Sequence, residues 1–158
     1  MQKITTFLWF DNNAEEAVNF YTSIFKDSKI INMSRYTEAG PGPAGSVMVA
    51  GFTLNGQEFM AINGGPVFKF TEAISLVVNC EDQSELDYYW EKLTADGGSP
   101  VQCGWLKDKF GLSWQVIPII IGKLMSSGDS ARSARVATAL YKMVKIDIAA
   151  LQKVYDGE

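Results

Sequence analysis

One sequence pattern occurs twice in this chain, and this repeat limits the possible folds more than any other feature does. The first copy spans residues 10–24, and the second copy, 69 residues later, spans residues 79–93. In each copy a residue that can cap a helix, Asn13 or Asp82, is followed at the third position by glutamate and then by an aromatic pair. A strand followed by a capped helix, present twice, predicts two copies of one module with a ligand cleft between them.

The first half of the chain has the spacing of one helix and four strands. Apolar, aromatic and threonine residues at positions 3–10 predict a buried strand. The dipeptide Asn55-Gly56 is the strongest hairpin signal in the chain. The other predicted elements are a helix from Asn13 to about residue 25 and strands at residues 29–36, 46–54 and 57–62. Residues 1–65 are therefore predicted to form a βαβββ module.

The second half repeats this order in a shorter form, over residues 66–122. Its predicted elements are a strand at residues 73–79, a helix from Asp82 to about residue 95, and strands at residues 100–105 and 113–119. These segments leave no clear space for a fourth strand. Beyond Gly122 the apolar residues take helical spacing, which predicts C-terminal helices over residues 123–158: one at 127–144 and a last one capped by Asp147. The predicted fold class is α+β, with two pseudo-repeated βαβββ modules and a helical appendage in one compact domain.

Charge and composition exclude several kinds of partner. A net charge of −4 provides no basic surface for nucleic acid or for an anionic membrane. The longest apolar run, residues 116–122, is far shorter than the roughly 20 residues that span a bilayer. The N-terminal residues do not resemble a secretory signal, so we expect a cytoplasmic protein in which Cys80 and Cys103 are reduced thiols.

Several short segments are more specific than this pattern. The most distinctive are Cys103-Gly-Trp105-Leu-Lys-Asp108 and Phe110-Gly-Leu-Ser-Trp114-Gln115-Val-Ile-Pro118. Together with Leu8-Trp9-Phe10, Phe52-Thr-Leu-Asn-Gly56 and the segment 143–151, they resemble the PhnB-like family of bacterial proteins. That family belongs to the vicinal oxygen chelate superfamily, which includes glyoxalases, bleomycin-resistance proteins and extradiol dioxygenases. The resemblance implies two βαβββ modules that form curved sheets around a shared cleft, usually in a homodimer.

Many members of this family carry the name of a demethylubiquinone methyltransferase, but the residues do not favour that activity. The glycine-rich segment 40–45 contains two prolines, which have no amide hydrogen to donate to a nucleotide. The segment also leads into a predicted strand, whereas a nucleotide-binding glycine loop leads into a helix. We therefore predict no cofactor.

Metal-dependent relatives hold their ion with four residues, two from each module. The resemblance maps these positions onto Thr6, Met60, Ser75 and Gln115, of which only the Gln115 amide oxygen is a reasonable ligand. Zinc, iron and nickel sites use imidazole, carboxylate or thiolate groups, and the chain contains no histidine. We therefore expect no catalytic metal.

The predicted cleft is lined mainly by apolar side chains. We predict the ligand-binding residues Trp9, Met48, Met60, Cys103, Trp105, Asp108, Phe110, Trp114 and Gln115. Core packing is the alternative for each aromatic residue, and a buried structural thiol is the alternative for Cys103. Tryptophan and methionine walls with few charges suit a flat apolar or aromatic ligand, which Gln115 and Asp108 would orient.

Three functions are consistent with these residues. The leading hypothesis is a protein that binds or sequesters a small organic molecule in a metal-free cleft, with no assigned catalytic residue. The first alternative is a metal-dependent lyase, isomerase or dioxygenase of the same superfamily. The second is an interaction module that assembles through its helical tail.

Overall fold

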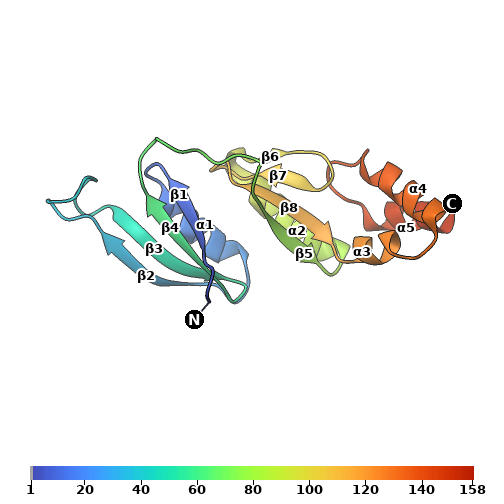
Figure 1. The fold of residues 1–158 in the computed structure, drawn as a ribbon, viewed down its shortest axis with the longest axis horizontal. Coiled ribbons are helices and arrows are strands. Elements are labelled where there is room, and N and C mark those ends of the chain that lie inside the picture. Colours follow the sequence, from blue (N-terminus) through green and yellow to red (C-terminus); the bar gives the residue numbers. More distant parts are fainter. Residues whose placement is uncertain (1) are drawn as a thin grey trace. The chain divides into compact units, whose positions relative to one another are not determined.

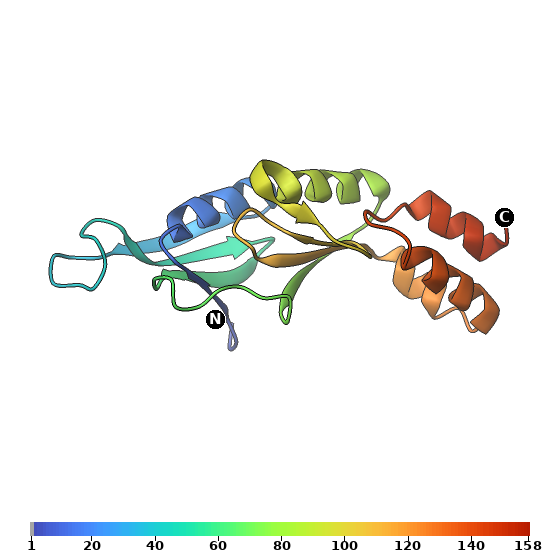
Figure 2. The ribbon, with the colours of Figure 1, turned by 90° about the horizontal axis from the view of Figure 1, so that it is seen from above.

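The computed structural model describes residues 2–158, which form two compact units, Met1–Phe70 and Thr71–Glu158. The division falls after Phe70, whereas the predicted module boundary follows residue 65, and the C-terminal helices belong to the second unit. Each unit contains a four-stranded sheet of mixed direction with a helix on one of its faces (Figures 1 and 2). This is the α+β architecture that the repeat predicts.

The first unit is a complete βαβββ module. Its elements are β1 (Thr6–Phe10), α1 (Ala14–Ile24), β2 (Lys29–Arg35), β3 (Val47–Leu54) and β4 (Gln57–Asn63), in the sheet order β1-β4-β3-β2. The outer strand β1 pairs with β4 in parallel, and the remaining pairs are antiparallel. Asn55 and Gly56 have φ values of 49° and 76°, so the predicted hairpin turn between β3 and β4 is confirmed.

The core of the first unit lies between α1 and one face of the sheet. The helix buries a stripe at helical spacing, consisting of Ala14, Ala17, Val18, Tyr21 and Ile24. The strands contribute every second residue to the same core, among them Leu8, Phe10, Phe52, Phe59 and Ala61.

The start of α1 differs from the prediction. The Asn13 side chain makes no capping hydrogen bond. Instead, Oδ1 of Asn63, at the end of β4, accepts a hydrogen bond from the Ala14 amide at 2.8 Å, and its Nδ2 donates to the Val47 carbonyl, also at 2.8 Å. A residue that is distant in sequence therefore replaces the local cap.

The second unit also contains a complete module. Its elements are β5 (Ser75–Cys80), α2 (Gln83–Thr94), the short 3₁₀ helix η1 (Ala95–Gly97), β6 (Ser99–Pro100), β7 (Trp105–Lys107) and β8 (Ser113–Pro118). The sheet order is β5-β8-β7-β6, with β5 parallel to β8. The fourth strand, for which the sequence left no clear space, is the two-residue β6. The single strand predicted at residues 100–105 is interrupted because Cys103 and Gly104 have φ values of 60° and 79°.

The cap of α2 confirms the sequence pattern. The Asp82 side chain accepts a hydrogen bond from the Glu85 amide at 2.8 Å, and the Glu85 carboxylate accepts one from the Glu81 amide at 2.7 Å. The helix then buries Leu86, Tyr89 and Leu93 against the second sheet.

Three helices follow β8: α3 (Ile120–Met125), α4 (Ser130–Leu140) and α5 (Ile148–Asp156). The predicted helix at 127–144 ends at Leu140, and α3 was not predicted. The Asp147 cap of α5 is confirmed, because its side chain accepts a hydrogen bond from the Ala150 amide at 2.9 Å. None of the helices within residues 2–158 is long and apolar enough to cross a membrane.

The segment between α4 and α5 is attached to the second module. The amides of Cys103 and Gly104 donate to the carbonyls of Met143 and Val144 at 2.8 and 2.9 Å. Ile146, in the same segment, is fully buried. The tail is therefore part of the folded second unit.

Candidate functional site

The open face of the first sheet

Among the described residues of the first unit, no helix lies on the face of the sheet opposite α1 (Figure 2). Strand alternation and register place apolar side chains on this open face. Phe7 pairs with Met60, and Trp9 pairs with Ile62, which also pairs with Val49. Phe7 is 51% exposed, and the other four side chains are half-buried. The open face therefore presents aromatic, aliphatic and thioether groups together.

The Trp9 side chain on this face is fixed in position. Its Nε1 donates a hydrogen bond to the Gly65 carbonyl at 2.9 Å, and its ring meets the Phe68 ring edge-on, with centroids 5.0 Å apart. A Cβ atom on Gly64 would lie 2.2 Å from the Trp9 ring, so the ring occupies space that only glycine leaves free. The orientation of the Trp9 ring is therefore fixed by contacts within the first unit.

The two methionines of the predicted cleft wall lie in different local structures. Met60 is on the open face, because it pairs with Phe7 and Gly51. Met48 lies at a register shift of β3, because Ser34 pairs with Val49 and Arg35 pairs with Val47, so strand alternation does not decide which face it occupies. The prediction of ligand-binding residues missed Phe7. Strand alternation could have indicated it, since Phe7 precedes Trp9 by two positions on β1 and so lies on the same face.

The mapped metal positions

The positions that resemblance assigns to metal ligands do not form a metal site. Thr6 pairs with Phe59 on the α1 side of the first sheet, whereas Met60 is on the opposite face. In the second sheet, Gln115 Nε2 donates to Ser75 Oγ at 2.8 Å, so these two side chains bind one another. Within residues 2–158, no three Cys, Asp, Glu or His side chains lie close enough together to hold a metal ion. The donor set of this chain therefore does not fit the metal that the family resemblance implies.

The second unit

The second sheet also has a face that α2 does not cover. Two rows of side chains cross it from β5 through β8 to β7. Register places Ser75, Ser113 and Lys107 in one row, and Val77, Gln115 and Trp105 in the next. Two of the predicted ligand residues, Trp105 and Gln115, therefore share this face. Ser113 and Lys107 were missed, although strand alternation with Gln115 and Trp105 could have indicated them.

The predicted residues Asp108, Phe110 and Trp114 form a structural turn between β7 and β8. Asp108 Oδ1 accepts hydrogen bonds from the amides of Phe110 and Leu112 at 2.9 and 3.1 Å, and Oδ2 accepts one from Trp114 Nε1 at 2.8 Å. Asp108 and Trp114 are 3% and 2% exposed. Trp114 pairs with Leu106 on the α2 side of the sheet. The Asp108 carboxylate and the Trp114 indole nitrogen are therefore hydrogen-bonded within the fold.

Cys103 lies in the loop between β6 and β7, where its thiol is 3.5 Å from the Leu140 carbonyl. It therefore contacts the tail rather than the open sheet face. Cys80 is fully buried, and burial, followed by the nearby carboxylates of Glu85 and Asp82, raises the pKa of its thiol to about 12.

The two thiols are expected to differ in accessibility. At pH 8, a thiol reagent should modify the partly exposed Cys103 in the folded protein and reach Cys80 only after unfolding, because Cys80 is buried and protonated. Counting modified thiols by mass spectrometry, with Cys103→Ser as the control, tests this. Rapid modification of Cys80 in folded Cys103→Ser would contradict it.

Surface hollows

The glycine-rich loop after β2 packs around a tyrosine. Cβ atoms on Gly40 and Gly42 would lie 2.8 and 2.4 Å from the Tyr36 side chain, whose hydroxyl donates to the Asn63 carbonyl at 2.8 Å. A hollow of 270 Å³ lies beside this loop, near Asp11. The glycines thus accommodate an aromatic ring, and the loop continues into β3. Neither feature fits a loop that binds a nucleotide-like methyl donor.

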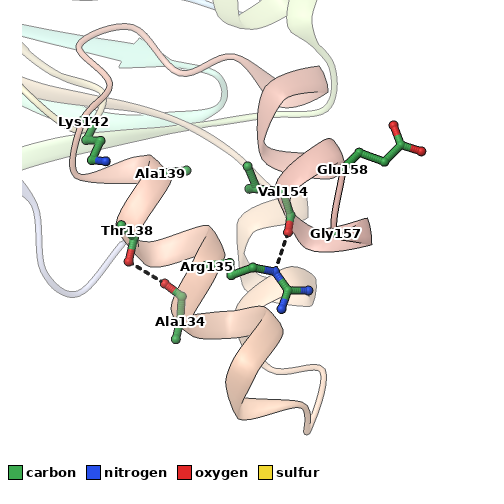
Figure 3. Close-up of a pocket in the computed structure, with 8 residues that line it drawn as sticks. All are labelled: Ala134, Arg135, Thr138, Ala139, Lys142, Val154, Gly157 and Glu158. Atoms are coloured by element: carbon green, nitrogen blue, oxygen red, sulfur yellow. Dashed lines mark hydrogen bonds between the residues drawn. The ribbon is translucent and has the colours of Figure 1, made fainter.

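A larger hollow of 520 Å³ lies between α4 and α5 (Figure 3). Small side chains, including Ala134 and Ala139, line it. Arg135 Nε donates to the Val154 carbonyl at 2.9 Å (Figure 3). Its Nη2 donates to the Tyr155 carbonyl at 3.1 Å. The guanidinium therefore satisfies carbonyls at the C-terminal end of α5. None of the predicted ligand residues lines this hollow.

Relatives of the chain

The chain matches a family model described as 3-demethylubiquinone-9 3-methyltransferase over residues 2–117. A PhnB protein from Bacillus cereus, which carries the same methyltransferase name, is 50% identical; the match covers 74% of this chain and 99% of that one, with a TM-score of 0.69. The structure of protein PA1353 from Pseudomonas aeruginosa is 22% identical, covers 72% of this chain and 95% of that one, and has a TM-score of 0.59. No curated protein matches the chain significantly.

The family match includes both βαβββ modules and ends within β8, before the C-terminal helices. The likeness to PA1353 shows the fold alone, whereas the extent of the family match and the identity to the Bacillus cereus protein show the family. The chain therefore belongs to the PhnB-like family that this model describes.

Proposed function

We propose that the protein binds a small apolar or aromatic molecule on the open face of its first sheet, without a catalytic metal. The observation that carries this proposal is the aromatic and thioether surface formed by Phe7, Trp9 and Met60. An exposed apolar surface of this kind is characteristic of a binding site, because water is displaced favourably from it.

The side chains of this surface suit a flat ligand. Trp9 is fixed by its hydrogen bond to Gly65 and by the Phe68 ring, so contact with it costs little conformational entropy. Met60 is unbranched and polarisable, and it can adapt to an aromatic edge. Phe7 and Phe68 are 51% and 62% exposed, which leaves apolar area for a ligand to bury.

Trp9→Ala is expected to weaken binding of the neutral probe 2-naphthalenemethanol by about tenfold or more, because a central, pre-positioned tryptophan carries a large share of binding energy. Isothermal titration calorimetry measures the change. Tyr141→Ala is the matched control, since Tyr141 is an aromatic residue of the tail that is 69% exposed, and it should leave the dissociation constant within about twofold.

Binding should also be unchanged by EDTA, because no metal takes part. The proposal fails if Trp9→Ala and Tyr141→Ala have equal effects, or if EDTA abolishes binding. Trp9→Phe separates ring contact from ring position, since it keeps an aromatic ring but loses the hydrogen bond to Gly65.

The homodimer implied by the family resemblance and the cytoplasmic location stay predictions. A second copy of the chain is the other occupant that this apolar face would suit. In that case 2-naphthalenemethanol would compete with association, and sedimentation equilibrium would show the dimer dissociating as the probe is added.

A further inference from the structure

The hydroxyl group of Ser113 has no hydrogen-bond partner. Among residues 2–158 it is the only buried side-chain nitrogen or oxygen in this position, and Ser113 is 1% exposed. A buried polar group without a partner has lost its hydrogen bonds to water and gained none in return. Such a group either lowers the stability of the fold or marks a position where a ligand supplies the missing hydrogen-bond partner.

The neighbours of Ser113 are hydrogen-bond donors. On the face of the second sheet opposite α2, Ser113 pairs directly with Ser75 on β5 and with Lys107 on β7. Side chains in such cross-strand pairs lie about 5 Å apart at Cβ. Ser75 Oγ accepts a hydrogen bond from Gln115 Nε2, a bond that does not use its own hydroxyl hydrogen. Two hydroxyls and an ammonium group therefore lie in one row.

One carboxylate already interacts with this row. Glu72, just before β5, forms an ion pair with Lys107 Nζ. The Lys107 hydrogen bond, followed by the backbone amide of Glu72 itself, lowers the pKa of the Glu72 carboxyl, which is therefore an anion at neutral pH. The Glu72 side chain is 60% exposed, and ion pairs of this exposure are weak. An incoming anion can therefore replace Glu72 on Lys107.

We propose that Ser75, Ser113 and Lys107 form a subsite for the carboxylate or phosphate group of a small ligand, with Glu72 as its internal competitor. Three donors converging on one anion give charge-assisted hydrogen bonds, which are stronger than neutral ones. The neighbouring row offers Trp105 and Val77, the latter 51% exposed, to the apolar part of the same ligand. The ligand class is therefore a small acid with an apolar body.

All residues of this subsite belong to the second unit, so none of them is part of the binding face proposed for the first sheet. The probe is 2-naphthoate, compared with the neutral 2-naphthalenemethanol, and binding is measured by calorimetry at low salt. Lys107→Met and Ser113→Ala are each expected to weaken naphthoate binding by about tenfold, since each removes a hydrogen bond to a charged group. Glu72→Gln should tighten it about threefold by removing the competing carboxylate.

Lys123→Met is the matched control, because it removes an equal charge from an exposed position on α3. It should change naphthoate affinity by less than about twofold. Ser113→Ala should leave the melting temperature unchanged or slightly higher, since the hydroxyl has no internal partner to lose. This combination of intact stability with weakened binding distinguishes a ligand contact from a structural role.

The subsite is ruled out if Lys107→Met and Glu72→Gln affect naphthoate no more than Lys123→Met does. It is also ruled out if Ser113→Ala lowers the melting temperature or leaves naphthoate binding intact. If Trp9→Ala weakens 2-naphthalenemethanol binding and Lys107→Met does not, the function proposed for the first sheet is supported even when the anion subsite is ruled out. If Trp9→Ala has no effect on 2-naphthalenemethanol while Lys107→Met still weakens naphthoate binding, that function fails and the anion subsite is retained.

Discussion

Replacing Asp108 with alanine is expected to lower the free energy of unfolding by about 3 kcal/mol, since it leaves several buried donors without an acceptor. The carboxylate accepts hydrogen bonds from the Phe110 and Leu112 amides and from Trp114 Nε1. Asp108 is 3% exposed, so water cannot easily replace these bonds. Urea denaturation followed by tryptophan fluorescence and circular dichroism measures the loss.

Two further variants separate the parts of this network. Trp114→Phe keeps an aromatic ring but removes the donor to Asp108, and it should cost about 1 kcal/mol from hydrogen bonding, apart from the change in ring size. Because the donor and the acceptor form one network, the double variant should lose less stability than the sum of the two single variants. Purely additive losses, or an Asp108→Ala protein as stable as wild type, would contradict the structural role assigned to Asp108.

Local signals in the sequence predicted most of the fold. The capped helix α2, the hairpin at Asn55-Gly56 and the start of α5 each depend on residues within four positions of one another. Such contacts are decided by backbone geometry and by side chains close in the sequence. The first helix shows the limit of this reasoning, because its cap comes from Asn63, 49 residues beyond Ala14.

The candidate site was harder to predict, because a motif does not show which face of a strand a side chain occupies. Trp9 and Met60 lie on an open face, and Met48 was assigned to the same wall although it lies at a register shift, where strand alternation does not decide its face. Asp108 and Trp114 belong to the most distinctive motif of the chain, yet they bond to one another. A motif residue can thus be distinctive because it holds a turn.

The same motif contains the position at which the tail is attached. The Gly104 amide donates to the Val144 carbonyl, and its carbonyl accepts from the Val116 amide at 2.8 Å. Gly104 has a φ of 79°, which alanine adopts at a cost of about 1 kcal/mol. An added Cβ would also lie 2.7 Å from Ile146 Cδ1 and 2.9 Å from the Val116 carbonyl oxygen. The steric problem therefore involves both the tail and the backbone of β8.

Gly104→Ala is accordingly expected to lose about 3 kcal/mol of stability and to detach the segment around Ile146, since a backbone oxygen cannot move aside without breaking the β7–β8 pairing. Gly111→Ala is the matched control: its φ is 86°, but nothing lies within 4 Å of the added Cβ. It should lose only the backbone cost of about 1 kcal/mol. Hydrogen exchange at the Cys103 and residue-104 amides, which bond to the tail, should accelerate in Gly104→Ala and stay slow in Gly111→Ala. Equal losses in the two variants, with both amides still protected, would show that close packing of the tail against Gly104 does not stabilise the second unit.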